Sequence, residues 1–378
     1  MKKDKINAYV VALIIAVLLF SFLTIYAFGE QKNGHFSISA KSAVLYQPEM
    51  QVFLYSKNAE ARLPMASTTK IMTALVALEN SEMDELVAID DSAIGTEGSS
   101  AYLRHGDVLT MEELLYALLL QSANDAAVAI AYHIGGSVEG FAEMMNEKAE
   151  KLALHNTHFT NPHGLDDEEH FTTAKELALI TAEAMNNPTF KKIVSTYKRT
   201  FATEDRTRTY VNHNKLLHLY DGCIGVKTGF TKKCGRCLVS AAERDGLTFI
   251  SVTLNAPSDW SDHTKMMNFG YGSLKKTILA NGFDHMYKIP VLDGESEYLT
   301  VANPDGADII TENRDIEVHE SVKLVKYAIA PLMRGDTLGE IIYTIDGNVV
   351  AKIPLLATET INKKEKQGLF QKILSIFD

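Results

Sequence analysis

The sequence predicts an α+β fold, in which one antiparallel sheet is covered by helices and a small all-β domain follows. Strand-like segments stand near both ends of the first domain, at residues 36–58 and 196–254. Amphipathic helical runs lie between them. Strands from both ends of such a stretch can join into one sheet, which the helices then cover. Beyond residue 281 the pattern changes to short alternating strands with Gly and Asp turns.

The composition is that of an ordinary globular protein and argues against nucleic acid as a partner. The 378 residues, enough for two domains, are 46% hydrophobic and 22% charged, and the formal net charge is -11. The chain has no basic stripe and no phosphate-binding glycine loop. We therefore expect no nucleic-acid partner and no cofactor.

The N-terminal residues 1–29 predict export across a membrane. Three lysines precede a nearly uninterrupted apolar run: Lys2, Lys3 and Lys5. This arrangement keeps the N-terminus in the cytoplasm and sends the body of the protein across. The run is long enough to span a bilayer, yet the small residues Ala27 and Gly29 could form a cleavage site. A cleaved export signal and a membrane anchor both stay open.

The first domain is expected over residues 36–285. The stretch "FSISAKSAVLYQPEMQVFLYSKN" predicts two strands around a Pro48-Glu49 turn, and a helix headed by Ser67 follows. Further helices are predicted to start at Ser/Thr caps: Thr110, Ser137 and Thr173. Strands return from about residue 196, where Asp245-Gly246 marks a hairpin, and a helix over about 259–274 closes the domain.

Two smaller segments complete the chain. Residues 287–357 predict a small β-sandwich domain, which offers no nucleophile, base or metal cluster and is interpreted as a spacer or docking module. In residues 361–378, apolar side chains fall on one helical face and lysines towards the other. This pattern predicts an amphipathic helix that associates with a membrane surface. A helix that docks on its own β-domain is the alternative.

The stretch "LPMASTTKIMTALVALEN" places a serine three residues before a lysine. Ser-x-x-Lys also occurs at Ser195 and Ser273, but only Ser67 heads a run with apolar residues at helical spacing. Residues i and i+3 lie on one helical face, so the hydroxyl of Ser67 and the amine of Lys70 can approach each other. The alternative is that Ser67 is a helix cap and Lys70 a surface lysine.

Two further motifs bear polar groups suited to a cleft. Ser122-Ala-Asn124 stands at a break between two helices, although both side chains could simply cap the second helix. Lys227-Thr228-Gly229 in "GVKTGFT" occurs once, on an expected strand, where Gly229 would let a substrate backbone lie against that strand.

With these motifs in the order Ser-x-x-Lys, Ser-x-Asn and Lys-Thr-Gly, the chain resembles the penicillin-recognising serine enzymes. More narrowly, "LPMASTTKIMTA", "SANDAA", "NPHGL" and "GVKTGFTKKCGRCLVSAAERDG" are similar to the low-molecular-mass D-alanyl-D-alanine carboxypeptidases. The resemblance implies a β-lactamase/transpeptidase-like first domain and peptidoglycan stem peptides as substrate. It also implies β-lactam antibiotics as covalent inhibitors and an extracytoplasmic enzyme attached to the cell membrane, facing the cell wall.

The resemblance also implies a role for each motif residue. Ser67 would attack the carbonyl between two D-alanines, with Lys70 as the base. Ser122 would relay a proton to the leaving amine, and Asn124 would bind the substrate amide and the lysine. The other assigned residues are those that hold the substrate carboxylate, Lys227 and Thr228; the oxyanion-hole N–H groups of Ser67 and Phe230; and His163 of "NPHGL", which could approach the site.

Two positions depart from the family pattern. His213 stands where some members carry an arginine that helps to hold the carboxylate, and Cys234 stands where alanine is common. The pair Cys234 and Cys237 has zinc-knuckle spacing and could bind metal with Cys223 and His213 or His218, but a second Cys-x-x-Cys pair is missing, so no metal site is assigned. A Cys223–Cys234 disulfide or buried thiols are the alternatives.

Three rival functions stay open. A class A β-lactamase would use a glutamate in a Glu-x-x-x-Asn loop, but Glu168 and Glu169 are followed four residues on by Thr172 and Thr173. A transpeptidase would differ only in the acceptor, and a non-catalytic membrane-tethered scaffold would keep the fold alone. Asp125 is interpreted as a first-turn helix charge and not as a catalytic acid.

Overall fold

The computed structural model describes residues 36–202 and 206–365, and the chain divides into two compact units between Tyr271 and Gly272. The division falls earlier than the boundary expected at residues 285–287. The reason is that strand β10 (Leu274–Ala280) pairs with β13 (Ala307–Glu312) and so belongs to the second unit.

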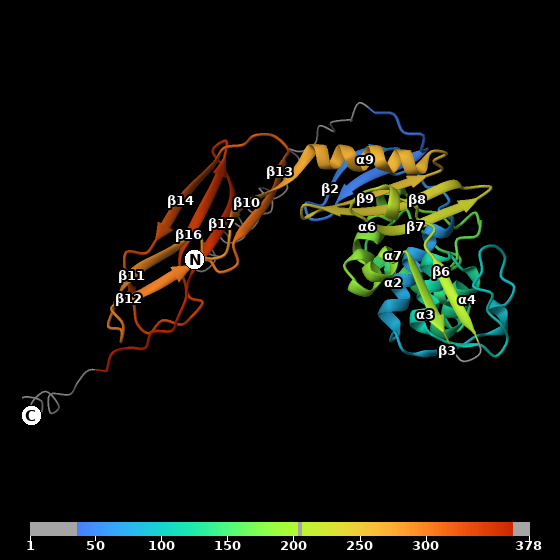
Figure 1. Cartoon of the computed structure of the whole chain (residues 1–378), viewed down its shortest axis with the longest axis horizontal. Coiled ribbons are helices and arrows are strands. Elements are labelled where there is room, and N and C mark those ends of the chain that lie inside the picture. Colours follow the sequence, from blue (N-terminus) through green and yellow to red (C-terminus); the bar gives the residue numbers. More distant parts are fainter. Residues whose placement is uncertain (1–35, 203–205, 366–378) are drawn as a thin grey trace, which may run out of the picture. The chain divides into compact units, whose positions relative to one another are not determined.

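A five-stranded antiparallel sheet forms the centre of the first unit (Figure 1). Its order is β2-β1-β9-β8-β7. The bounds are β1 Ser42–Gln47, β2 Val52–Lys57, β7 Cys223–Thr231, β8 Gly235–Arg244 and β9 Leu247–Leu254. The N-terminal hairpin pairs with the last strand, with Val44 opposite Val252. This confirms the predicted sheet assembled from both ends of the domain.

Turn chemistry sets the predicted hairpins. Asp245 and Gly246, between β8 and β9, have φ values of 51° and 72°. Two consecutive left-handed residues are what a two-residue type I′ hairpin requires, and Asp-Gly favours that geometry. Asp346 and Gly347, in the second unit, repeat the pattern with φ values of 50° and 77°. The predicted Asp245-Gly246 hairpin is confirmed.

Helices cover both faces of the sheet (Figure 1). On one face lie α2 Lys70–Asn80, α3 Met111–Leu120, α4 Asn124–Gly135, α5 Val138–Lys151, α6 Ala174–Met185 and α7 Pro188–Ser195. Val44 and Tyr46 of β1 point into this helical core, whereas Leu45 between them faces α9 (Asp259–Ser273). A Cβ added to Gly270 of α9 would lie 3.1 Å from Leu45, so glycine permits close packing there.

The predicted caps are present at three helix starts. The hydroxyl of Thr110 accepts a hydrogen bond from the backbone N–H of Glu113 at 3.2 Å, and that of Thr173 accepts from Glu176 at 3.0 Å. Ser137 accepts from Gly140 in the same way. Each cap satisfies an N–H that the helix itself leaves without a partner.

The strand expected from residue 196 does not join the main sheet. It forms β5 (Lys198–Ala202), which pairs with β6 (Thr207–Val211) in a separate two-stranded sheet. A second small sheet pairs β3 (Leu86–Ala88) with β4 (Val108–Thr110). As a result β7, which contains the Lys-Thr-Gly motif, is an edge strand of the main sheet. The short helix α8 (Leu216–Leu219) precedes it.

The second unit is built from strands, as predicted. Its six-stranded sheet has the order β14-β16-β17-β12-β11-β15. The bounds are β11 Met286–Leu292, β12 Tyr298–Ala302, β14 Val318–Leu324, β15 Ala328–Ile329, β16 Thr337–Ile345 and β17 Asn348–Ala357. Its core is separate from that of the first unit and includes Leu299, Val301, Ile341 and Leu355.

The two predicted membrane segments lie largely outside the described residues. Residues 1–29 and 366–378 are not described. Of the predicted C-terminal helix, Ile361 and Lys363 instead form β-bridges with Leu332 and Gly294. Within the described ranges, no helix is both long and apolar enough to cross a bilayer.

Replacement of Asp262 should destabilise the first unit. Its carboxylate, on α9, accepts hydrogen bonds from the backbone N–H of Ser39 at 2.9 Å and of Ala40 at 3.1 Å, and from the Ser39 hydroxyl. Asp262→Ala leaves these donors without a partner and should lower the free energy of unfolding by about 3 kcal/mol. Urea denaturation, followed by the fluorescence of the single tryptophan, Trp260, measures the change.

The matched control is Asp221→Ala, at an exposed carboxylate of the same unit. It should change the free energy of unfolding by less than about 0.5 kcal/mol. Equal effects of the two substitutions would show that the Asp262 contacts do not stabilise the unit.

Candidate active site

Ser67 lies in a tight turn that leads into α2, and it does not cap that helix. The turn is a 3-10 helix over Ala66–Thr69. Neither this turn nor α2 receives a capping hydrogen bond from a side chain, so the interpretation of Ser67 as a helix cap is wrong. Ala66 has a φ of 48°, a left-handed conformation that is uncommon for residues other than glycine. Strain of this kind is often found at functional sites.

The amine of Lys70 contacts three groups from three parts of the chain. Its Nζ lies 3.1 Å from Ser67 Oγ, 2.7 Å from Asn124 Oδ1 and 2.6 Å from the main-chain oxygen of His163. The amide and carbonyl oxygens can only accept, so the amine donates an N–H to each. In the neutral amine this leaves the lone pair for Ser67, whose hydroxyl can donate to it.

Burial favours the neutral form of this amine. The Lys70 side chain is fully buried, which lowers its pKa well below the ordinary value of 10.5. The nearby Lys227 lowers the pKa further, and the more modest effect of Asp125 opposes both. A buried amine with a lowered pKa beside a serine hydroxyl has the properties of a general base.

Ser122 and Asn124 enter the site from the break between α3 and α4. Ser122 is left-handed, with a φ of 62°, and its side chain lines the cavity. Asn124 is the first residue of α4; its Nδ2 donates to the carbonyl of Glu97 at 2.5 Å while its Oδ1 accepts from Lys70. The cap of α4 is Ala123, so the capping alternative for these two residues is wrong.

Asp125 is structural, as expected. Its buried carboxylate accepts hydrogen bonds from the backbone N–H groups of Ala101 and Leu103 and from the Ser100 hydroxyl. These bonds fix the loop in front of α4, next to the cavity residue Ser99. Asp125 therefore positions one wall of the site.

The loop over residues 160–173 reaches the site through its backbone. The carbonyl of His163, and not its imidazole, contacts Lys70. The imidazole accepts from the N–H of Leu165 at 3.2 Å, and the described lining of the cavity does not include it. Burial lowers the pKa of His163 to about 3, with Lys70 as a smaller cause, so the ring is neutral. Direct substrate binding by His163 stays a prediction.

His170 is a residue that sequence reasoning missed. Its ring bridges Thr69 Oγ1, at 2.8 Å, and the backbone N–H of Thr160, at 3.0 Å. Burial lowers its pKa to about 4, so the ring stays neutral at pH 7. His170 thereby ties the loop to the residue next to Lys70. Its isolated position in the sequence gave no signal of this contact.

Strand β7 forms the opposite wall. Lys227 is 1% exposed, and burial lowers its pKa to about 7. Its Nζ donates to the carbonyl of Thr228 at 2.8 Å. Thr228, Gly229 and Phe230 line the cavity, and the Phe230 side chain is 65% exposed. The structure therefore brings all three motifs together around Ser67.

Gly229 also has a packing role within the protein. A Cβ at this position would lie 3.1 Å from the backbone nitrogens of Ser67 and Thr68. The glycine therefore allows β7 to approach the Ser67 turn, and the close contact is within the protein. The approach of a substrate backbone to this strand at Gly229 stays a prediction.

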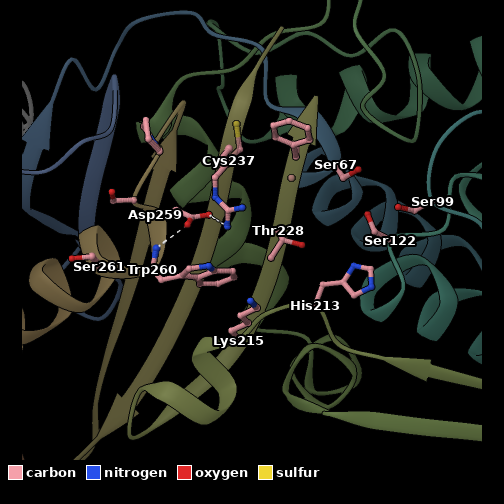
Figure 2. Close-up of a pocket in the computed structure, with 15 residues that line it drawn as sticks. Ser67, Ser99, Ser122, His213, Lys215, Thr228, Cys237, Asp259, Trp260 and Ser261 are labelled. Atoms are coloured by element: carbon pink, nitrogen blue, oxygen red, sulfur yellow. Dashed lines mark hydrogen bonds and ion pairs between the residues drawn. The ribbon is translucent and has the colours of Figure 1, made fainter. Parts of the chain in front are cut away.

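A cavity of about 720 Å³ opens beside these groups (Figure 2). Figure 2 shows Ser67, Ser99 and Ser122 on one side, Thr228 between, and Asp259 and Trp260 on the other. The remaining lining residues are His213, Lys215, Gly229, Phe230, Arg236, Cys237, Pro257, Ser258 and Ser261. His213 therefore does belong to the site, and burial and Lys227 lower its pKa.

The three cysteines are free thiols; Cys234 and Cys237 are buried, and Cys223 is partly buried. Cys223 begins β7 and Cys234 follows its far end at Thr231, and a strand rises about 3.3 Å per residue. A Cys223–Cys234 disulfide is therefore wrong, and Cys223 is too far away to share a metal with Cys234 and Cys237. Within the described residues, no His, Cys, Asp or Glu side chains gather as metal ligands. Burial raises the pKa of all three thiols.

Comparisons with known proteins match both units. The family model for D-alanyl-D-alanine carboxypeptidase matches residues 28–258, and the C-terminal domain of penicillin-binding protein 5 matches residues 275–363. A solved structure, penicillin-binding protein 5 from Haemophilus influenzae, has a TM-score of 0.63 and 27% identity. That match covers 86% of this chain and 98% of the other.

Two curated relatives agree with these matches. D-alanyl-D-alanine carboxypeptidase DacF of Bacillus subtilis is 31% identical over 366 residues, which cover 93% of this chain and 94% of the relative. The D-alanyl-D-alanine carboxypeptidase of Streptomyces sp. is 40% identical over 239 residues, or 58% of this chain and 82% of the relative. The chain therefore belongs to the D-alanyl-D-alanine carboxypeptidase family of serine peptidases.

Proposed function

We propose that Ser67 and Lys70 remove the terminal D-alanine from peptidoglycan stem pentapeptides through an acyl-enzyme, and that β-lactams acylate the same serine. The supporting observation is the contact of 3.1 Å between Ser67 Oγ and the buried Nζ of Lys70. Asn124 and the His163 carbonyl take the other hydrogen-bonding positions of that amine. The amine is thereby oriented towards the serine.

Acylation starts with proton transfer. The neutral amine of Lys70 takes the proton of the Ser67 hydroxyl while Oγ attacks the carbonyl carbon between the two D-alanines. The carbonyl oxygen becomes an oxyanion, which the backbone N–H groups of Ser67 and Phe230 stabilise. Donors of this kind contribute about 3 kcal/mol each to transition-state stabilisation.

The leaving group then needs a proton. Ser122 lines the same cavity and donates its hydroxyl proton to the departing amine, and the protonated Lys70 restores it. D-alanine leaves, and Ser67 carries the acyl group as an ester. Water attacks this ester with Lys70 again as the base. Asn124 binds the substrate amide and keeps Lys70 in place, while Lys227 and Thr228 hold the terminal carboxylate.

The polar groups of the cavity favour this function over a β-lactamase. Among the described residues that line it, Asp259 alone carries a carboxylate, and Arg236 pairs with it. Glu168 and Glu169 are exposed. No carboxylate of the described lining is therefore placed to drive water rapidly onto a penicillin-derived ester, so we expect a long-lived adduct.

The decisive experiment combines β-lactam labelling with D-alanine release. The protein without residues 1–29 should form a covalent β-lactam adduct on Ser67 and release D-alanine from a pentapeptide. Ser67→Ala should abolish both, and Lys70→Ala should slow both by about 10³-fold, because the general base is lost. Circular dichroism checks that the fold survives.

The sequence supplies a matched control in its second Ser-x-x-Lys motif. Ser195 ends α7 and Lys198 begins β5, and both are exposed. Ser195→Ala and Lys198→Ala should leave labelling and release unchanged. An adduct that hydrolyses within seconds would indicate a β-lactamase, transfer to an amine in preference to water a transpeptidase, and the absence of any adduct a scaffold.

We further propose that the enzyme works outside the cytoplasm, attached to the membrane by its terminal segments. The support is the sequence of residues 1–29 and 361–378. With residues 1–29 removed, the protein should still sediment with vesicles that contain phosphatidylglycerol, and it should lose this binding when residues 366–378 are deleted.

A pair of substitutions separates apolar insertion from charge. Ile373→Asp, on the predicted apolar face, should reduce the bound fraction to that of the deleted protein. Gln371→Asp adds the same charge on the other face and should leave most of the binding intact. Equal losses would argue against an amphipathic membrane helix.

A further inference from the structure

The residues assigned to the substrate carboxylate supply little permanent positive charge. Lys227 has a pKa of about 7, so its ammonium form is only partly populated at neutral pH. Its Nζ also donates to the carbonyl of Thr228. Burial and the nearby Lys227 lower the pKa of His213, which disfavours the charged imidazolium form. Thr228 offers a hydroxyl alone. An anionic D-alanine end calls for a stronger partner.

Arg236 lines the same cavity from the neighbouring strand, β8. The register places it directly opposite Phe230. Opposite residues of an antiparallel pair share a face, and so do residues two apart on one strand. The side chains of Arg236, Phe230 and Thr228 therefore stand on the same face of the sheet.

Two residues at the start of α9 hold the guanidinium in place. Its Nη2 lies 2.9 Å from Asp259 Oδ2, and its Cζ lies 5.6 Å from the centre of the Trp260 ring. The Asp259 side chain is 3% exposed, whereas that of Arg236 is 42% exposed. Figure 2 shows Asp259 and Trp260 on the wall across from Ser67 and Ser122. A guanidinium has five N–H donors, so one ion pair leaves donors that can face the cavity.

We propose that Arg236 supplies the permanent positive charge that binds the terminal carboxylate of the substrate. This inference rests on the proposed function. Arginine stays charged at any physiological pH and matches a carboxylate with two parallel N–H groups. Arg236 thereby compensates from β8 for the arginine that is missing at His213. Lys215, another cation of the lining, is exposed and so more strongly screened by solvent.

Two thioesters test the proposal directly. Both carry the same N-acetyl-D-alanyl group; one has mercaptoacetate as its leaving group, and the other has the methyl ester of mercaptoacetate. The first ends in a carboxylate and the second is neutral. The released thiol is measured for wild type and for Arg236→Gln. Because the acyl group has no charged side chain, recognition of a diamino acid further along the peptide cannot contribute.

Arg236→Gln should raise KM for the anionic thioester by about 10- to 100-fold with little change in kcat, because a charge-assisted hydrogen bond is lost from substrate and transition state alike. For the neutral thioester, kcat/KM should change by less than about twofold. Arg236→Lys should restore part of the lost affinity. The control Arg314→Gln removes an arginine that is paired with Glu312 and Asp346 in the second unit. It should leave KM and kcat/KM unchanged for both thioesters.

Arg236→Gln leaves the buried carboxylate of Asp259 without its partner, which could disturb the fold. The double variant Arg236→Gln/Asp259→Asn removes that charge. It should likewise raise KM for the anionic thioester and leave kcat/KM for the neutral thioester nearly unchanged. Equal losses on both thioesters, or no loss on either, would overturn the inference. A wild-type protein that releases no D-alanine from a pentapeptide would instead overturn the proposed function.

Discussion

The site depends on the burial of one amine. Lys70 Nζ lies among Ser67 Oγ, Asn124 Oδ1 and the carbonyl of His163, out of contact with solvent. A buried ammonium costs several kcal/mol of desolvation, whereas a neutral amine largely avoids this cost. The fold therefore converts an ordinary lysine into a base by where it places the side chain. Each partner of Lys70 comes from a different segment, so the complete tertiary structure is required.

Contacts from both walls of the cleft hold Ser67 and Lys70 in position. Gly229 permits β7 to approach the Ser67 turn, and Asn124 connects Lys70 to the carbonyl of Glu97. A second buried lysine, Lys227, lowers the pKa of the first. The two lysines are coupled, because a charge on one disfavours a charge on the other. Recognition of an anionic substrate then benefits from a cation that cannot lose its proton, as proposed for Arg236.

Much of the fold could be predicted because its signals are local. The Asp-Gly hairpins, the caps at Thr110 and Thr173, and the helical run after Lys70 each express a preference of a few neighbouring residues. The order of the three motifs indicated the family because each motif is also a short local sequence. The separate pairing of β5 and β6 was missed because a strand-like pattern does not determine which other strand it will pair with.

The features that the sequence did not reveal concern contacts between distant residues. The sequence placed Ser67 at a helix start, but the left-handed Ala66 and the 3-10 turn follow from packing that no local pattern reveals. The approach of the His163 backbone to Lys70 has no side-chain signature at all. Arg236 lies outside the Ser-x-x-Lys, Ser-x-Asn and Lys-Thr-Gly motifs, and the β7–β8 register brings it to the cleft.

The most direct test of this account is the pKa of Lys70 itself. NMR of protein labelled at the lysine side chains can follow each amine during a pH titration, and the signal missing in Lys70→Ala identifies Lys70. The account predicts that Lys70 titrates well below 10.5, so that acylation is lost only as the pH falls through this lowered pKa and the amine gains a proton. A Lys70 signal that titrates near the ordinary lysine value of 10.5 would contradict it.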